Sequence, residues 1–383
     1  MLSSWLDTLL TPLFKQKRFH LLPVEHILPA LHRQLIGGDA IVVAPPGAGK
    51  STCLPLSLLK LDVFKDKKII LLQPRRIAVR TIASYLASQL GESVGHTIGY
   101  RIRGEVKVSA NTRLEIVTEG ILTRMLQNQP DLPDVGLVIF DEFHERSVHA
   151  DFSLALCIEV QQALREDLRL LVMSATLDVT ALGELLPAAK LLESSGKSYP
   201  VDIIYHPDNS SLHLFEKVSR LVIYVFPKHQ HDCLVFLPGA ADINKAAQRL
   251  SQHFLSTGED EVEVVKLFSE LSKNEQQQAL LPNPAGKRKI VLATNIAETS
   301  LTIEGIEVVI DSGIEKKAIF QLNRGVTHLQ SQNISQASAT QRAGRAGRLT
   351  AGTCYRLWSK EQHSRLAQQI TPEIMHSDMS SFI

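Results

Sequence analysis

The chain has 383 residues, enough for two or three domains at roughly 100 to 200 residues each. Its 41 Lys and Arg nearly balance its 40 Asp and Glu, and the resulting net charge of +1 excludes a strongly basic protein that coats nucleic acid. No apolar run approaches the roughly 18 residues of a membrane span. The N-terminus has no basic residue before its apolar stretch, and the four cysteines lie far apart. We therefore expect a cytoplasmic protein with no membrane segment, disulfide framework or zinc site.

Short apolar runs rich in β-branched residues alternate with longer amphipathic stretches through most of the chain. Such runs, nearly continuous in apolar residues and separated by helical stretches, predict parallel strands covered by helices on both faces of a sheet. The first group of predicted strands is 40–43, 68–72, 114–117, 137–140 and 168–173. The second group is 201–205, 233–237, 262–267, 289–293 and 306–310.

The two groups predict two consecutive α/β domains. We place the first at 21–195 and the second at 196–360, with the Ser-, Gly- and Pro-containing stretch 193–200 as the linker. Residues 1–20 fit neither sheet and are expected to form an N-terminal extension. Residues 361–383 stop in what reads as a helix start, so we expect the beginning of a truncated C-terminal region.

A phosphate-binding loop is predicted directly after the first strand. The segment APPGAGKST, residues 44–52, matches G-x-x-x-x-G-K-[ST] except that Ala44 holds the first glycine position. Small residues allow backbone N–H groups to curl around phosphates at a helix N-terminus. Lys50 would then reach the β and γ phosphates, and the Ser51 hydroxyl would bind Mg²⁺. The alternative is an ordinary glycine-rich turn between a strand and a helix.

Two adjacent carboxylates, Asp141 and Glu142, follow the buried strand 137–140. Such a pair is costly at a buried strand end unless a cation binds there. Asp141 fits the Mg²⁺ carboxylate of P-loop NTPases, and Glu142 fits the base that orients and deprotonates the attacking water. A solvated turn at the strand end is the alternative. The later tripeptide 174–176, SAT, follows another strand and by itself is typical of a turn or a capped helix start.

Arginines recur every third residue in QRAGRAGR, residues 341–348. On a helix this spacing would align Arg342, Arg345 and Arg348 along one face. The segment could be a solvated basic helix or a stripe that binds RNA. It could also supply arginine fingers from the second domain to a nucleotide bound on the first, an arrangement worth about 10³ to 10⁵ in rate. Nucleotide would then control whether the two domains close.

Eight ordered segments together resemble superfamily 2 helicases of the DEAH/RHA type, over about residues 20–380. They are GAGKST, QPRR (73–76), VTEG (117–120), DEFH (141–144), SAT, FLPG (236–239), TNIAETSLTI (294–303) and QRAGRAGR. The segments DEFHERS, QPRRIAVR and GYRIRGE are most similar to a bacterial branch of that family. The resemblance implies two tandem RecA-like P-loop domains with mainly parallel sheets covered by helices. It also implies further C-terminal domains beginning near residue 371, and a β-hairpin within residues 316–335 that acts on the nucleic-acid strand.

Position by position, the resemblance implies three groups of site residues. The nucleotide site comprises Gly47, Ala48, Gly49, Lys50, Ser51, Thr52, Asp141 and His144, with Ser51 and Asp141 also holding Mg²⁺. The catalytic group comprises Glu142, Gln341, Arg345 and Arg348. The residues facing single-stranded nucleic acid are Arg75, Arg76, Thr118, Thr294, Asn295 and Thr299. Arginines, hydroxyls and an amide can hold phosphate and ribose without reading base sequence.

The leading hypothesis is a helicase or translocase, expected to be a monomer, that couples hydrolysis of Mg²⁺–ATP or another NTP to movement on single-stranded nucleic acid, with RNA as the expected polymer. A second hypothesis is a nucleotide-gated RNA-binding or scaffold protein with little hydrolysis, but it would have no need of Glu142 and the arginine fingers. A third is a P-loop ATPase of another superfamily, which would lack the TNIAETS and QRAGRAGR segments.

Overall fold

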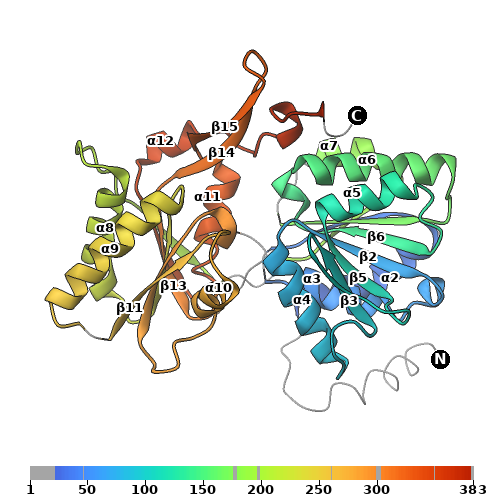
Figure 1. Cartoon of the computed structure of the whole chain (residues 1–383), viewed down its shortest axis with the longest axis horizontal. Coiled ribbons are helices and arrows are strands. Elements are labelled where there is room, and N and C mark those ends of the chain that lie inside the picture. The colour runs from blue at the N-terminus through green and yellow to red at the C-terminus, as the bar shows by residue number, and fades with distance from the viewer. Residues whose placement is uncertain are drawn as a thin grey trace.

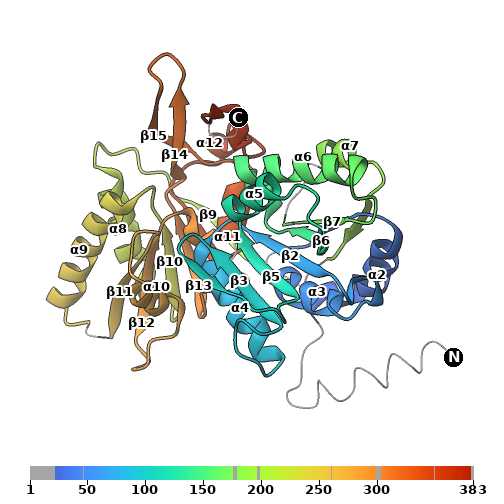
Figure 2. The ribbon, with the colours of Figure 1, turned by 45° about the vertical axis from the view of Figure 1, so that its right-hand side comes forward.

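A computed structural model of the chain describes residues 22–45, 47–175, 179–195, 199–259, 261–298, 303–348 and 350–380. These residues form two α/β units side by side, each built on its own sheet (Figures 1 and 2). The N-terminal unit runs from η1 to β8, and the C-terminal unit runs from β9 to α12. Among the described residues, every helix is too short or too polar to cross a membrane.

The N-terminal unit has an eight-stranded sheet in the order β4-β3-β5-β2-β6-β7-β1-β8, parallel except for the β3–β4 pair. Its strands are β1 Ala40–Val43, β2 Lys68–Gln73, β3 Ile98–Ile102, β4 Glu105–Lys107, β5 Leu114–Thr118, β6 Val135–Phe140, β7 Arg169–Ser174 and β8 Lys190–Glu193. Its helices are η1 Pro23–Ile27, α2 Leu28–Gly37, α3 Lys50–Leu58, η2 Asp62–Phe64, α4 Arg76–Gln89, α5 Glu119–Asn128, η3 Phe143–Glu145, α6 Val148–Ala163 and α7 Val179–Leu185.

The C-terminal unit has a six-stranded, fully parallel sheet in the order β11-β12-β10-β13-β16-β9. Its strands are β9 Val201–Tyr205, β10 Asp232–Phe236, β11 Val262–Leu267, β12 Arg288–Ala293, β13 Ile306–Asp311 and β16 Gly352–Arg356. Its helices are α8 Leu214–Val225, η4 Phe226–Lys228, α9 Ala240–Ser256, α10 Lys273–Leu280, η5 Asn295–Ala297, α11 Gln336–Ala343 and α12 Lys360–Ser364, followed by η6 Glu373–Met375.

Each sheet is buried on both faces, which explains the nearly continuous apolar runs of its strands. Along β2, Ile69 and Leu71 join the core beneath α2, α3 and α4, whereas Ile70 and Leu72 join the core beneath α5 and α6. The C-terminal sheet is covered in the same way by α8 and α9 on one face and by α10 and α11 on the other. The ten strands predicted from the sequence are all present, so the predicted fold class is confirmed.

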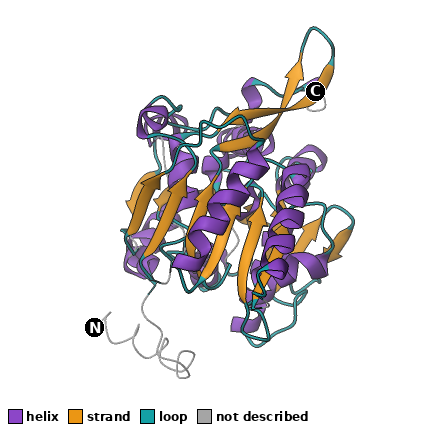
Figure 3. Cartoon of the chain, turned by 90° about the vertical axis from the view of Figure 1, so that its left-hand side faces the viewer, coloured by secondary structure: helices purple, strands orange, loops and turns teal. Residues whose placement is uncertain are grey.

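A two-stranded hairpin rises from the C-terminal unit, as Figure 3 shows. Its strands, β14 Ile314–Gln321 and β15 Val326–Asn333, pair antiparallel and belong to neither large sheet. The hairpin that the resemblance implied therefore exists, and it begins two residues before the predicted range. Two of its leucines are exposed: Leu322 at the turn is 88% exposed, and Leu329 on β15 is 68% exposed.

The segment 366–376, which we call the C-terminal strap, connects three parts of the molecule. The first backbone N–H groups of α11, which have no partner inside the helix, donate to the carbonyls of Ala367 (2.8 Å) and Gln368 (3.1 Å). The hairpin meets the strap where the N–H of Phe320 donates to the carbonyl of His376 (2.9 Å). The strap also reaches the N-terminal unit, because the N–H of Glu373 donates to the carbonyl of Arg146 (2.9 Å).

Candidate functional site

The loop between β1 and α3 has the backbone geometry of an anion-binding turn. Gly47 has φ of +82° and Gly49 has φ of +98°, a region that residues with a Cβ rarely adopt. A Cβ at Gly49 would also lie 3.0 Å from Leu22 Cδ1 and 3.2 Å from Val24 Cγ2. Gly49 is followed by the first turn of α3, whose free N–H groups and dipole favour a bound anion.

Lys50 is the first residue of α3 and is 5% exposed. Its ammonium group donates to the carbonyl of Ala44 and, at 3.1 Å, to that of Pro45. Burial lowers the pKa of Lys50, an effect that the charges of Glu142 and Asp141 oppose. A buried ammonium group held by loop carbonyls is suited to turn towards a phosphate, since the phosphate would restore its favourable electrostatics.

Asp141 follows β6 directly and is held from several sides. Its carboxylate accepts hydrogen bonds from the Gln73 amide, from the Ser51 hydroxyl and from the Glu142 N–H (2.9 Å). Burial raises the pKa of Asp141, and the neighbouring Glu142 carboxylate raises it further. A buried carboxylate beside a serine hydroxyl offers the hard oxygen ligands that Mg²⁺ prefers, so the residues fit this ion.

The turn that follows Asp141 has a constrained backbone. Glu142 and Arg146 have φ of +52° and +48°, and each costs roughly 1 kcal/mol or more for a residue other than glycine. The N–H of Ala175 donates to His144 Nδ1 (3.2 Å), which leaves the ring proton on Nε2. Nε2 lies 3.4 Å from Glu142 Oε2. The end of β7 thus fixes the histidine ring beside Glu142.

The arginine segment does not form the continuous helix that would align three arginines. Helix α11 ends at Ala343, and Gly344 to Gly347 form turns. Arg342 points into the C-terminal unit, where it pairs with Glu298 (2.9 Å) and Asp311 (3.0 Å). The prediction of one shared face for Arg342, Arg345 and Arg348 is therefore wrong. The glycines favour the end of the helix, and the buried ion pairs hold Arg342 away from the other two.

Arg345 and Arg348 lie at the interface between the units. Arg345 donates to the carbonyl of Glu298 through Nε (2.8 Å). Burial lowers the pKa of both guanidinium groups, and the charge of Arg348 lowers the pKa of Arg345 further. The carboxylate of Glu142, on the opposite unit, raises the pKa of both and so favours their charged forms. Together with Lys50, they concentrate buried positive charge at one place on the interface. This charge fits a polyanion such as a triphosphate.

Gln341 gives an independent indication that a ligand binds at this interface. The side chain is 4% exposed, and among the described residues neither its amide nitrogen nor its amide oxygen has a hydrogen-bond partner. Leaving both atoms of a buried amide unsatisfied is costly. A bound phosphate would accept from the amide nitrogen and an ordered water would donate to the amide oxygen, so this side chain as well as the charge fits a nucleotide.

The predicted nucleic-acid residues lie at the carboxyl ends of strands, but the structure brings only some of them together. Arg75 donates through Nη1 to the carbonyl of Asn295 on the other unit (2.6 Å). Arg76 is exposed and donates to the carbonyl of Arg103 (3.3 Å). Thr118 is the N-cap residue before α5, and Thr294 is the N-cap residue before η5. Thr299 lies outside the described residues.

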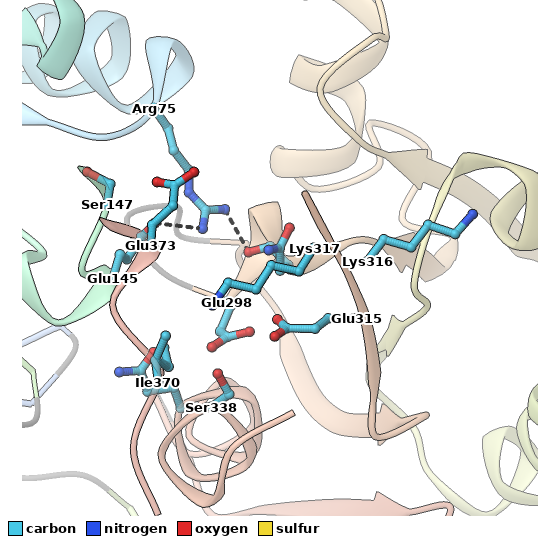
Figure 4. A pocket seen from close by; sticks show the side chains of 12 residues that line it. Arg75, Glu145, Ser147, Glu298, Glu315, Lys316, Lys317, Ser338, Ile370 and Glu373 are labelled. Atoms are coloured by element: carbon cyan, nitrogen blue, oxygen red, sulfur yellow. Dashed lines mark hydrogen bonds and ion pairs between the residues drawn. The ribbon is translucent and has the colours of Figure 1, made fainter. Parts of the chain in front are cut away.

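A cavity of about 180 Å³ lies where the two units, the hairpin and the strap meet (Figure 4). Arg75, Asn295 and Gln341 line it, together with the hairpin lysines Lys316 and Lys317. Four carboxylates also line it: Glu145, Glu298, Glu315 and Glu373. The cavity is lined by both basic and acidic side chains, whereas the region around Lys50 concentrates positive charge. We therefore treat the cavity as a separate feature of the same interface.

Several residues at the interface were missed by the sequence reasoning. Gln73, Glu145, Glu298 and Glu373 contact predicted site residues or line the cavity, yet none was singled out. Gln73 and Glu145 lie inside quoted segments, so their closeness to Arg75 and Asp141 was a usable signal. Glu298 also lies inside a quoted segment, TNIAETSLTI, but this segment and the one containing Glu373 are distant from the others in the chain, and only the fold brings them here.

Two family models match the chain. The DEAD/DEAH box helicase model matches residues 26–185, and the helicase conserved C-terminal domain model matches residues 214–350. These matches coincide with the two units described above, and the chain belongs to the DEAD/DEAH box helicases. The resemblance to DEAH/RHA helicases is thereby confirmed.

Within this family, the chain is similar to the ATP-dependent RNA helicase HrpB of Escherichia coli, with 48% identity over 94% of the chain and 44% of that protein. It is 38% identical to the ATP-dependent RNA helicase HrpA of Borreliella burgdorferi, over 90% of the chain and 42% of that protein. A crystal structure of the E. coli DEAH/RHA helicase HrpB superposes with a TM-score of 0.88, over 94% of the chain and 46% of that one. The chain thus spans less than half the length of these relatives.

Proposed function

We propose that the chain is the NTP-hydrolysing core of a helicase or translocase that acts on single-stranded RNA. The observation that carries the proposal is the convergence at one interface of Lys50 and Glu142 from the N-terminal unit with Arg345 and Arg348 from the C-terminal unit. The names of its relatives, ATP-dependent RNA helicases, support ATP as the nucleotide and RNA as the polymer.

Nucleotide binding is assigned to the loop before α3. The backbone of Gly47, Ala48 and Gly49 encloses the phosphates, and Lys50 exchanges its loop carbonyls for phosphate oxygens. Ser51 and Asp141 would hold Mg²⁺, and Thr52 completes the first turn of the helix. When bound, Mg²⁺ neutralises charge on the β and γ phosphate oxygens and orients them for in-line attack. ATP is the proposed substrate, and other NTPs are further candidate substrates.

Hydrolysis is assigned to residues from both units. Glu142 orients a water and accepts its proton, while His144 holds Glu142 from the side of β7. Arg345 and Arg348 stabilise the negative charge that develops on the transferred phosphoryl group. Gln341 donates from its amide to the same group or to the water. Since these donors belong to the other unit, turnover requires the two units to approach, and opening after product release would move them apart.

Strand binding is assigned to Arg75, Arg76, Thr118, Thr294, Asn295 and Thr299. Opening and closing of the cleft would shift the grip of the two units on the strand backbone. We further propose residues 21–195 and 196–360 as the two working domains and 361–383 as the start of a C-terminal region. The cytoplasmic location and the monomeric state stay predictions.

Steady-state ATP hydrolysis, measured with no polymer, with single-stranded RNA and with single-stranded DNA, tests the proposal. We expect stimulation by RNA, and we expect Glu142→Gln to abolish turnover while nucleotide binding persists. Equal loss of binding and turnover in this variant would contradict the role of Glu142 as the base. Nucleotide-dependent RNA binding by the wild-type protein without hydrolysis would favour the gated scaffold instead.

A further inference from the structure

Arg75 is engaged by protein groups from both units. Its Nη2 donates to Glu145 Oε2 at 3.2 Å, and its Nη1 donates to the carbonyl oxygen of Asn295 at 2.6 Å. The side chains of Arg75 and Glu145 are 18% and 19% exposed, so the ion pair lies at the wall of the cavity (Figure 4). A guanidinium in this arrangement cannot offer the same N–H groups to a phosphate.

Glu145 belongs to the turn that carries the hydrolytic residues. Its own N–H donates to the carbonyl of Glu142 at 2.9 Å, and it directly follows His144. The turn is bounded by Glu142 and Arg146, both with positive φ. The Glu145 side chain and the Glu142 carbonyl thus belong to one short hydrogen-bonded turn.

The far end of the turn is anchored by the C-terminal strap. The N–H of Glu373 donates to the carbonyl of Arg146 (2.9 Å), and the N–H of Val148, at the start of α6, donates to Glu373 Oε2 (3.0 Å). The strap therefore fixes the side of the turn that faces α6. On the side facing the hydrolytic residues, the N–H of Ala175 holds His144 and the carboxylate of Asp141 holds the N–H of Glu142. The ion pair between Arg75 and Glu145 is a further restraint on this side.

Carboxylate and phosphate are competing ligands for one guanidinium. A strand phosphate that reached Arg75 would find Glu145 already there, with Glu298 and Glu373 also lining the cavity. A phosphate that took the N–H group now used by Glu145 would displace its carboxylate, because two anions held by the same N–H group repel each other. The same exchange would loosen the Arg75 contact with Asn295 and thus one link between the units.

We propose that Glu145 is a positioning residue that competes with the strand phosphate for Arg75, and that its displacement by the strand frees the turn carrying Glu142 and His144. This inference rests on the proposed function, because it takes a nucleic-acid phosphate as the ligand of Arg75. In the strand-free protein the ion pair restrains the turn and holds hydrolysis low. In the strand-bound protein the restraint is absent.

The experiment measures binding of a fluorescein-labelled oligouridine and ATP turnover with and without it, for the wild type, Glu145→Gln and Glu166→Gln. Glu166 is exposed in the loop before β7, at the opposite edge of the sheet, so its variant controls for the loss of one negative charge. We expect Glu145→Gln to bind the oligouridine about three- to tenfold more tightly and to turn over faster without it, which lowers the stimulation ratio. Glu166→Gln should match the wild type.

A double-mutant cycle with Arg75→Gln separates this exchange from general electrostatics. In the Arg75→Gln background, Glu145→Gln should leave oligouridine affinity unchanged, since the ligand for which Glu145 competes is gone. An increase of the same size in both backgrounds, or a Glu145→Gln variant that binds and responds like the wild type, would overturn the inference. If the wild-type protein neither binds oligouridine nor changes its ATP turnover when oligouridine is added, the proposed function itself would be contradicted.

Discussion

Replacing Arg342 by methionine tests whether this arginine is structural. Its guanidinium pairs with Glu298 and Asp311, and the side chains of the three residues are 1%, 6% and 0% exposed. It also lies 4.9 Å from the centre of the Phe236 ring. Methionine would fill much of the volume but leave two carboxylates buried without their cation. Removing one partner from a buried ion pair costs about 3–5 kcal/mol, a large part of the 5–15 kcal/mol typical of a domain.

Urea unfolding followed by fluorescence measures this loss. Trp358 is 8% exposed and packs in the C-terminal unit, so its emission reports the unit that contains Arg342. We expect a lower midpoint with little change in the slope. The variant that also carries Glu298→Gln and Asp311→Asn should recover most of the loss, because no buried charge is left unpaired. A loss below about 1 kcal/mol, as for an exposed pair, or the absence of recovery would refute the reasoning.

Three further expectations concern the interface. Arg345→Ala or Arg348→Ala should lower kcat by about 10³-fold or more while changing the nucleotide Kd far less, and an unchanged kcat would remove the finger assignment. Burial raises the pKa of Glu119 to about 7 from 4.5, so the folded chain retains a proton that the unfolded chain releases and stability falls as pH rises from about 4.5 to 7. Glu119→Gln should flatten that dependence and raise the Tm at pH 8; a variant with the wild-type pH profile would contradict the shift. Oligouridine affinity should fall as salt rises, because phosphate contacts release counterions, and a flat response would argue against backbone binding.

The sequence predicted the strands of both sheets wherever burial on two faces left an apolar run. Strands that are stabilised mainly by pairing with neighbouring strands were not predicted. Strand β16, Gly352–Arg356, has no apolar run, but it pairs with β13 on one side and β9 on the other. Strand β3, Ile98–Ile102, contains Gly99, which suits its close packing, since a Cβ there would lie 2.6 Å from the carbonyl oxygen of Lys107. Local propensity is overridden by such pairing.

The nucleotide site was more predictable than the strand site. Asp141 and Glu142 follow β6 directly, Lys50 and Ser51 follow the loop after β1, and the carboxyl ends of parallel strands meet at one edge of a sheet. The contact of Arg75 with Asn295 depends on how the two units approach one another and could not be read from either alone. The same holds for Arg342, whose repeat with Arg345 suggested a shared role although its ion pairs lie inside one unit.

The C-terminal strap gives the molecule a short mechanical path. Glu373 is hydrogen-bonded to Val148, although 225 residues separate them in the chain. A few residues away, the strap is bonded to Lys317 (3.0 Å) and Phe320 (2.9 Å) on the hairpin. A load applied to the hairpin is thus delivered to the start of α6 and to the turn beside Glu142 without crossing the C-terminal sheet. A protease cut within 366–376 would break this path while leaving both sheets whole.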